Sequence, residues 1–309
     1  MDMGERVGVK SARILWTSFM DSPYMTLLSL LTGVKSGAPK LTHAIPSRGR
    51  DSVTAVTSLG NEVFVLRSVS QQQVEVYDAS TFTLQRNITV PGLGSWFWGG
   101  LAACANYECL YVSDNEHSSV HRAELSGSNA MKNWSVARCP VGLSVNKEHN
   151  VVVACLGAHK IQEYTTHGAL VREISLKQAG VMGPLHAVQL STGDYVVSEC
   201  KSPGVVSVVG IDERVVRRYC PSPSSDVGEM EYPSGLAVTK NDDILAADAY
   251  NNRILLVNSS LSSAQELAVP VDDEIQWPRS LCLDESLGRL YVGEVGGSYR
   301  VLVFDGVRL

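Results

Sequence analysis

One position recurs in this sequence at the end of a short apolar run, and four of its six occupants are carboxylates. In chain order the six are Arg67, Asp114, Cys155, Glu199, Asp248 and Glu294. Carboxylate oxygens are preferred ligands of Ca²⁺, so acids gathered around one axis could hold that cation. The same acids could instead accept hydrogen bonds within their own segments, as Asp248 could from Arg253, because half-buried acids usually have such partners.

The histidines supply a second set of candidates for chemistry. A catalytic zinc site needs about three imidazoles or similar donors and one open position. Of seven histidines, only His186 is expected on an inner strand, in the slot that Gly142 and Gly235 occupy in other copies of a repeat. We expect the His186 side chain to form hydrogen bonds in the wall of a central channel. The weaker alternative is that it binds a metal ion. The sequence has no nucleophile elbow that would indicate covalent catalysis.

The elements that carry these residues belong to a repeat of six copies. The clearest copies begin at Pro140, Pro233 and Pro278, and looser ones begin at Ser52, Gly99 and Pro184. The prolines recur about every 45 residues, which is typical of a four-stranded propeller blade. Each copy continues with runs of β-branched and aromatic residues between turn residues, as at 244–247 and 254–257, and such runs favour strands.

The copy from Pro233 to Val257 resembles the NHL repeat, whose pattern is roughly Pro-x-Gly-Ile/Leu-Ala-Val, then Ala-Asp, then Asn-x-Arg-Ile. The positions that match are Pro233, Gly235, Ala237, Asp248, Asn252, Arg253 and Ile254. The resemblance extends loosely over residues 40–309 and implies an all-β, six-bladed propeller of four-stranded antiparallel blades. The chain is similar to the propellers of TRIM-like proteins, but its cysteine pairs do not have the spacing of a RING finger or B-box.

Closing the ring requires one more strand than the last copy supplies. Open sheet edges invite association, so six blades must close on themselves. The last copy reaches Leu309 after three strands, whereas residues 40–45 precede the first copy unassigned. We therefore expect an N-terminal strand to complete the sixth blade. The predicted organisation is an N-terminal extension over 1–38 and one propeller over 39–309.

Composition and cysteine number bear on compartment and partners. The net charge is −6, with 19% charged and 44% hydrophobic residues, which is ordinary for a globular protein and offers no general attraction to phosphate. Seven cysteines, an odd number, favour a reducing compartment, so we expect a cytoplasmic protein. Secretion is the alternative if residues 1–38 form a signal peptide. Their apolar stretch is too short and interrupted to predict a membrane span, and no feature indicates an oligomer rather than a monomer.

These observations favour a non-enzymatic module that binds a protein or peptide through loops around the channel. The expected binding residues are Arg67, Asp114, Glu199, Asp248 and Glu294, with Tyr250, Asn251 and Asn252 beside them. A basic peptide would complement the acids. No cofactor is expected, although the alternative is a Ca²⁺- or Zn²⁺-dependent hydrolase or lyase that uses Asp114, Glu199, Asp248 and Glu294, or His186.

Two further interpretations concern aromatic and basic residues. RNA binding through the opposite face is a second alternative, because some NHL propellers bind single-stranded RNA. The cluster at Trp96 and Trp98 could form a stacking surface, but we expect it to pack between the first and second blades. We likewise expect Tyr232 and Trp277 to pack before their own prolines.

Overall fold

The computed structural model describes residues 39–309 except 48, 50, 69–71, 95–97, 127–129 and 268–274. The expectations for residues 1–38, and for Trp96, lie outside the described residues. No helix in the described part of the chain is long and apolar enough to cross a membrane.

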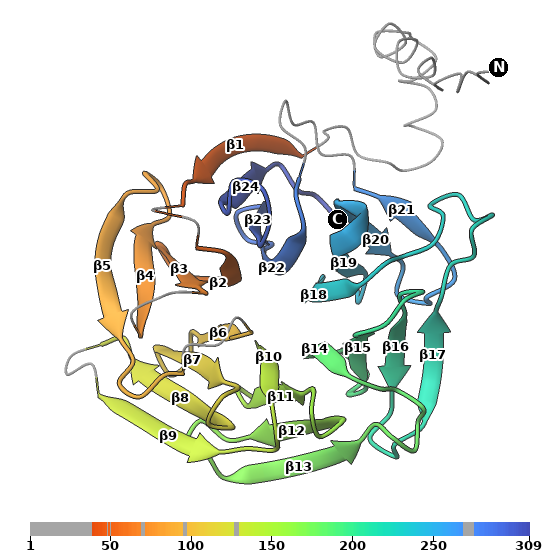
Figure 1. Cartoon of the computed structure of the whole chain (residues 1–309), viewed down its shortest axis with the longest axis horizontal. Coiled ribbons are helices and arrows are strands. Elements are labelled where there is room, and N and C mark those ends of the chain that lie inside the picture. Colours follow the sequence, from red (N-terminus) through yellow and green to blue (C-terminus); the bar gives the residue numbers. More distant parts are fainter. Residues whose placement is uncertain are drawn as a thin grey trace, which may run out of the picture. The chain divides into compact units, whose positions relative to one another are not determined.

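The described strands form six sheets of four strands each, and all pairings are antiparallel. Figure 1 shows the sheets as blades around a central axis, with β2, β6, β10, β14, β18 and β22 innermost. The expected all-β, six-bladed propeller is therefore confirmed. Within the described residues, the one helical element is the 3-10 turn η1 (Ala249–Asn251).

The blades are numbered in chain order. Blade 1 contains β2 (Val53–Leu59), β3 (Glu62–Arg67), β4 (Gln73–Asp78) and β5 (Leu84–Thr89), and blade 2 contains β6 (Leu101–Cys104), β7 (Cys109–Asp114), β8 (Ser119–Glu124) and β9 (Met131–Ser135). Blade 3 contains β10 (Pro140–Val145), β11 (Val151–Cys155), β12 (Lys160–Tyr164) and β13 (Leu170–Ser175), and blade 4 contains β14 (Pro184–Gln189), β15 (Tyr195–Glu199), β16 (Val206–Val209) and β17 (Val215–Tyr219). Blade 5 contains β18 (Pro233–Val238), β19 (Ile244–Asp248), β20 (Arg253–Val257) and β21 (Ala264–Glu266). Blade 6 contains β22 (Pro278–Asp284), β23 (Arg289–Glu294), β24 (Val301–Asp305) and β1 (Lys40–Ile45).

The hydrophobic cores lie between neighbouring blades. The six buried clusters each combine residues of two adjacent blades, as Phe64 and Leu110 do for blades 1 and 2. The second strand of a blade is buried on both sides, as every residue of β11 is, and therefore consists of β-branched and small apolar residues. Burial of apolar surface at six interfaces thus holds the ring together.

The N-terminal strand β1 closes the ring, as expected. It pairs with β24 from Lys40 opposite Asp305 to Ile45 opposite Val301. Ile45 is fully buried in the cluster that joins blade 6 to blade 1, together with Val53 of β2. The first and last strands of the propeller therefore belong to the same sheet.

Close packing of the inner strands explains the glycine in the repeat. A Cβ on Gly142 would lie 2.4 Å from the carbonyl oxygen of Leu185 in the next blade, and one on Gly235 would lie 2.5 Å from that of Arg279. At these two positions the neighbouring inner strand approaches so closely that a side chain would collide with its backbone. The Pro-x-Gly phrase is thus a consequence of the ring geometry.

Candidate functional site

The inner strands of all six blades line a central channel. Its cavity has a volume of about 270 Å³, and its walls are mostly small or apolar, with His186 and Arg279 among the few large polar residues. Each inner strand begins at the same face of the ring at which the second strand of its blade ends, as Pro233 opposite Asp248 shows. We call this the leading face.

The four carboxylates of the recurring position lie at the leading face but do not line the channel. Asp114 is 2% exposed, and Glu199, Asp248 and Glu294 are 0% exposed. None of the four lines the channel cavity. The structure thus encloses each acid within its own blade rather than presenting it to the channel, and their role in binding stays a prediction that this burial does not favour.

Arginines of the same blades neutralise two of these acids. Asp248 accepts a hydrogen bond from Nε of Arg253 at 2.8 Å and one from the backbone N–H of Glu231 at 2.6 Å. Glu294 accepts from Nε of Arg300 at 3.0 Å and from the backbone N–H of Gln276 at 2.8 Å. In both blades the acid fixes the loop that leads into the inner strand.

Asp114 and Glu199 have different partners for the same role. Glu199 lies 3.1 Å from Nζ of Lys201 and accepts a hydrogen bond from Ser207 at 2.8 Å. Asp114 lies 2.8 Å from Nδ1 of His117. Burial acts to raise the pKa of Asp114, but hydrogen bonds from His121, His117 and backbone N–H groups outweigh it and hold that pKa well below its usual range. The hydrogen bond to Asp114 raises the pKa of His117 in return.

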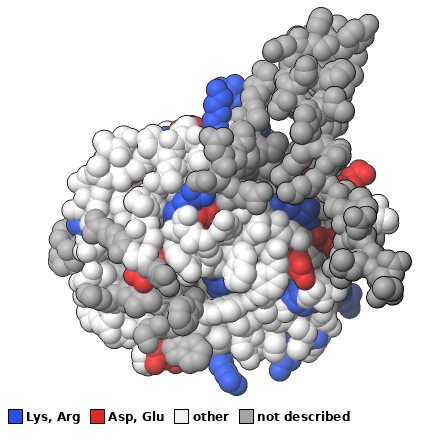
Figure 2. All heavy atoms as spheres, turned by 45° about the horizontal axis from the view of Figure 1, so that its top comes forward, with Lys and Arg blue, Asp and Glu red and all other residues white. Residues whose placement is uncertain are grey.

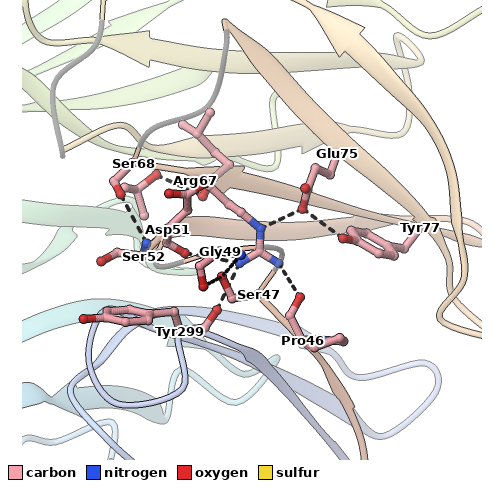
Figure 3. Close-up of polar contacts among 12 residues, drawn as sticks. Pro46, Ser47, Gly49, Asp51, Ser52, Arg67, Ser68, Glu75, Tyr77 and Tyr299 are labelled. Carbon is pink, nitrogen blue, oxygen red and sulfur yellow. Dashed lines mark hydrogen bonds and ion pairs between the residues drawn. The ribbon is translucent and has the colours of Figure 1, made fainter.

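Blade 1 carries the same arrangement with the charges exchanged. Arg67 takes the acid's position and donates from Nε to Glu75 at 2.7 Å (Figure 3). Its Nη2 donates to the carbonyl oxygen of Pro46 and its Nη1 to that of Tyr299, each at 3.0 Å. Pro46 follows β1, and Tyr299 precedes β24. Arg67 therefore fastens blade 1 to both strands that close the ring, and it is not available to a ligand.

The described acids and histidines do not come together in a metal site. Within the described residues, no group of three or more histidine, cysteine, aspartate or glutamate side chains is arranged to hold a metal ion. The carboxylates of Asp114, Glu199, Asp248 and Glu294 lie in four different blades, each bound to its local partners.

His186 uses both ring nitrogens to join blades. Its Nδ1 accepts a hydrogen bond from the backbone N–H of Leu236 at 3.0 Å, and its Nε2 lies 2.9 Å from the carbonyl oxygen of Leu143. These bonds assign the proton to Nε2. Burial lowers the pKa of His186, so the neutral ring links β10, β14 and β18 along the channel wall.

The leading face also carries a row of aromatic side chains around the mouth of the channel. Tyr232 stacks on Tyr250 with ring centroids 4.8 Å apart, and Tyr250 meets Trp277 at 5.7 Å. Trp98 meets Tyr232 edge to face at 6.4 Å. Tyr250 and Trp277 are 52% and 51% exposed. We call these four residues the aromatic row.

Trp98 corrects the expectation that it packs between the first and second blades. It precedes β6 of blade 2, whereas Tyr232 precedes β18 of blade 5, and these two blades lie on opposite sides of the ring (Figure 1). The contact between the two rings therefore spans the mouth of the channel. Tyr232 and Trp277 also stand at this mouth rather than inside a core.

Arg279 lies beneath this row. Its guanidinium carbon is 4.2 Å from the centre of the Trp98 ring, which is a cation–π contact. Burial lowers the pKa of Arg279, and the polar groups near it are Tyr232 and Cys200. No described carboxylate forms an ion pair with it, in contrast to Arg67, Arg253 and Arg300.

The backbone that presents two of the aromatic residues is strained. Tyr232 and Trp277 have φ angles of +60° and +49°, in the left-handed region that costs a non-glycine residue about 1 kcal/mol or more. The equivalent residue of blade 4, before Pro184, is Gly183 with φ +64°. Large aromatic side chains thus occupy a conformation that glycine adopts without strain.

The loop residues expected near the site divide into two groups. Tyr250 belongs to the aromatic row, and the side-chain oxygen of Asn252 accepts a hydrogen bond from the backbone N–H of Trp277 at 2.8 Å. Asn251 instead donates to Asp248 at 2.8 Å and supports the framework. The residue that sequence reasoning missed is Arg279. Its signal was a charge directly after Pro278, where the other proline-led copies have Val141, Leu185 and Ser234.

Where described residues are visible in Figure 2, acids and bases are scattered and often adjacent. The arginines in and beside β17 of blade 4 also lie near acids. Arg218 lies 3.8 Å from Glu199, and Arg214, at 85% side-chain exposure, lies 3.8 Å from Asp212.

Comparison with known proteins supports the fold and the repeat. The model of the NHL repeat matches residues 230–255, which contain β18 and β19, so the NHL resemblance is confirmed. No curated protein shows a significant sequence match to the chain.

Solved structures resemble the whole ring. A streptogramin B lyase is 12% identical, with 85% of this chain and 96% of that chain covered and a TM-score of 0.63. A hydrazine synthase from Kuenenia stuttgartiensis is 17% identical, with coverage of 90% and 99% and a TM-score of 0.61. A chain of a nidogen/laminin complex is 16% identical, with coverage of 72% and 82% and a TM-score of 0.56. At such identities these likenesses show the fold alone.

Proposed function

We propose that this chain is a non-enzymatic interaction propeller that binds an extended peptide segment of a protein partner across the mouth of the channel. The observation that carries the proposal is the aromatic row, whose members Tyr250 and Trp277 expose about half of their surface. Exposed large aromatic groups gathered at one place are typical of binding sites rather than of an inert surface.

The residue types favour a protein ligand. Tyr, Trp and Arg are the residues most enriched among those that dominate protein–protein binding energy. The row is also held in place before any ligand arrives, since Asn252 fixes the backbone of Trp277 and Cys200 donates a hydrogen bond to the Tyr232 hydroxyl at 3.4 Å. Such preorganisation reduces the entropy lost on binding.

Single-stranded RNA is less well supported at this face. A strand of RNA needs a track of cations for successive phosphates beside its stacking platforms. Here Arg67, Arg253 and Arg300 are bound to carboxylates of their own blades. The chain as a whole carries a net charge of −6. The described leading face has stacking residues, but it has no row of cations that could bind successive phosphates.

An enzymatic role has similarly little support in the described residues. Both nitrogens of His186 are occupied, and the acids of the leading face are enclosed as structural partners. The expectation of a basic partner depended on those acids being exposed, so it loses its basis here. The TRIM-like character, the cytoplasmic location and the monomeric state remain predictions.

A peptide-binding assay tests the proposal. The full chain is incubated with a pool of heptapeptides randomised at every position, and bound peptides are recovered and quantified by mass spectrometry. The variants are Trp277→Gly and Tyr250→Ser, and the control is Ile211→Ser, which removes a 60% exposed side chain from the β16–β17 turn at the opposite face.

We expect enrichment by the wild type and by the Ile211→Ser variant, and at least a tenfold loss in Trp277→Gly and Tyr250→Ser at unchanged melting temperature. Equal enrichment by all four proteins, or enrichment by none, would contradict the proposal.

A further inference from the structure

We infer that Arg279 recognises the C-terminal carboxylate of the bound peptide, so that the partner enters the mouth of the channel by its chain end. This inference rests on the proposed function and adds the ligand's chemistry and polarity to it.

Arg279 stands where a side chain is turned toward the channel. The pairing of β22 with β23 is irregular between Pro278 and Ser280, so Arg279 is the extra residue of a β-bulge. A bulge redirects the side chain of its extra residue, and bulges are common beside functional sites. The same irregularity occurs in blades 1, 3 and 4, where the extra residues are Thr54, Val141 and Leu185. Only in blade 6 among these does the bulge carry a charge, and Arg279 lines the cavity.

Among the described residues, the Arg279 guanidinium has no anionic partner. A guanidinium has five N–H donors and stays charged at neutral pH. Partly buried charges are normally paired, because desolvation without a partner is costly. No described residue accepts a hydrogen bond from Arg279 or forms an ion pair with it, and its one contact of this kind is the face of Trp98 at 4.2 Å. A planar anion with two oxygens matches such a fork.

The space beside Arg279 favours a chain end over an acidic side chain. The cavity of about 270 Å³ could hold on the order of nine water molecules, which is the room that one or two amino-acid residues need. Its walls include Val141, Leu185 and Leu281. A C-terminal residue would place its carboxylate on the guanidinium and its own apolar side chain against these walls, with the preceding residues on the aromatic row. An internal Asp or Glu would leave the apolar space unfilled.

Two matched peptide pools test the inference. Both pools are attached through an N-terminal linker and randomised over the last four positions; one ends in a free carboxylate and the other in a carboxamide. The proteins are the full-length wild type, Arg279→Met, Trp277→Gly, and the control Arg214→Met, which removes an exposed arginine from the opposite face. Melting temperatures are measured for each protein.

The inference predicts at least tenfold more peptide bound from the free-carboxylate pool than from the amide pool, with apolar final residues enriched. Arg279→Met should abolish that preference without lowering the melting temperature, and Arg214→Met should keep it. Equal binding of both pools that is lost in Trp277→Gly would overturn the carboxylate inference while supporting the proposed function. Enrichment of amidated peptides with internal Asp or Glu would also overturn it. Binding of neither pool would overturn the proposed function as well.

Discussion

Replacing Arg67 by methionine should loosen the ring at its point of closure. The Arg67 side chain is 3% exposed and holds three elements at once: Glu75 of β4, the carbonyl oxygen of Pro46 after β1, and that of Tyr299 before β24 (Figure 3). Methionine fills much of the same volume but provides no N–H group. The variant therefore removes the polar links between blade 1 and the closing strands and leaves the packing largely intact.

The magnitude follows from the burial of the partner that remains. Glu75 is 17% exposed, and without Arg67 it retains only the hydroxyl of Tyr77, at 2.9 Å, as a described side-chain partner. Removing one member of a buried ion pair typically costs about 3–5 kcal/mol, because the other charge stays buried without compensation. For a domain of this size about 1 kcal/mol corresponds to about 2 °C, so the melting temperature should fall by about 6–10 °C.

Urea unfolding of the full chain, followed by circular dichroism, measures this effect against a matched control. Arg86 pairs with Glu62 in the same blade, but these side chains are 41% and 31% exposed, so Arg86→Met should cost about 0–1 kcal/mol. In the double variant Arg67→Met/Glu75→Leu both charges are gone, and we expect at least half of the lost free energy of unfolding to return.

Two results would refute the reasoning. One is an Arg67→Met variant no less stable than Arg86→Met, which would mean that Arg67 does not fasten the ring. The other is a double variant as unstable as the single one, which would locate the cost in lost packing rather than in the uncompensated carboxylate.

The remaining predictions concern the mouth of the channel, one pH-dependent pair and the closing strand. Arg279→Met should leave the melting temperature unchanged or raise it, since a half-buried guanidinium without a carboxylate is a cost to the fold; a clear drop in a thermal melt would mean that Arg279 has a structural partner. Trp277→Gly should change the free energy of unfolding by less than about 1 kcal/mol, because relief of the left-handed backbone offsets lost contacts; a loss above about 3 kcal/mol in urea would show that the ring belongs to a core. The pKa of His117 is raised by Asp114, so the pair stabilises the fold fully below the ordinary histidine pKa of about 6.5 and less as pH rises through the raised value. His117→Gln should accordingly cost more stability at pH 6 than at pH 8.5 in urea melts, and an equal cost at both would contradict the assignment. Deletion of residues 40–46 should leave β24 as an open edge, giving a marked loss of cooperative unfolding and association on gel filtration; a monomer with unchanged unfolding would argue against ring closure by β1.

The fold could be predicted from the sequence because its signals are local and repeated. The spacing of the blade prolines, the β-branched runs and the missing fourth strand of the last copy each restrict the architecture, and residues 40–45 were the available strand. Even the Pro-x-Gly phrase reflects a contact that recurs in several blades, as at Gly142 and Gly235. In a repeat protein each copy gives a separate indication of the same local structure.

The site could not be predicted in the same way, because it depends on contacts between distant blades. The sequence places Asp248 and Glu294 at a common face, but only the three-dimensional structure shows both fully buried beside their arginines. Nothing local indicates that Trp98 crosses the mouth to Tyr232. That no described carboxylate pairs with Arg279 is likewise a property of the assembled ring, since it depends on which arginines and backbone groups those carboxylates already bind.

The most direct test of peptide binding at the aromatic row is a titration of tryptophan indole signals. The full chain is labelled with ¹⁵N-tryptophan, and the heptapeptide most enriched by the wild type is added in steps during two-dimensional NMR. Binding at the mouth predicts that the indole signals of Trp98 and Trp277 shift together. The signal of Trp134, whose indole Nε1 is buried and whose ring lies against Tyr111 and Tyr164 of blades 2 and 3, should stay unchanged. Unshifted Trp98 and Trp277 signals at a saturating peptide concentration would place the binding elsewhere and contradict the account.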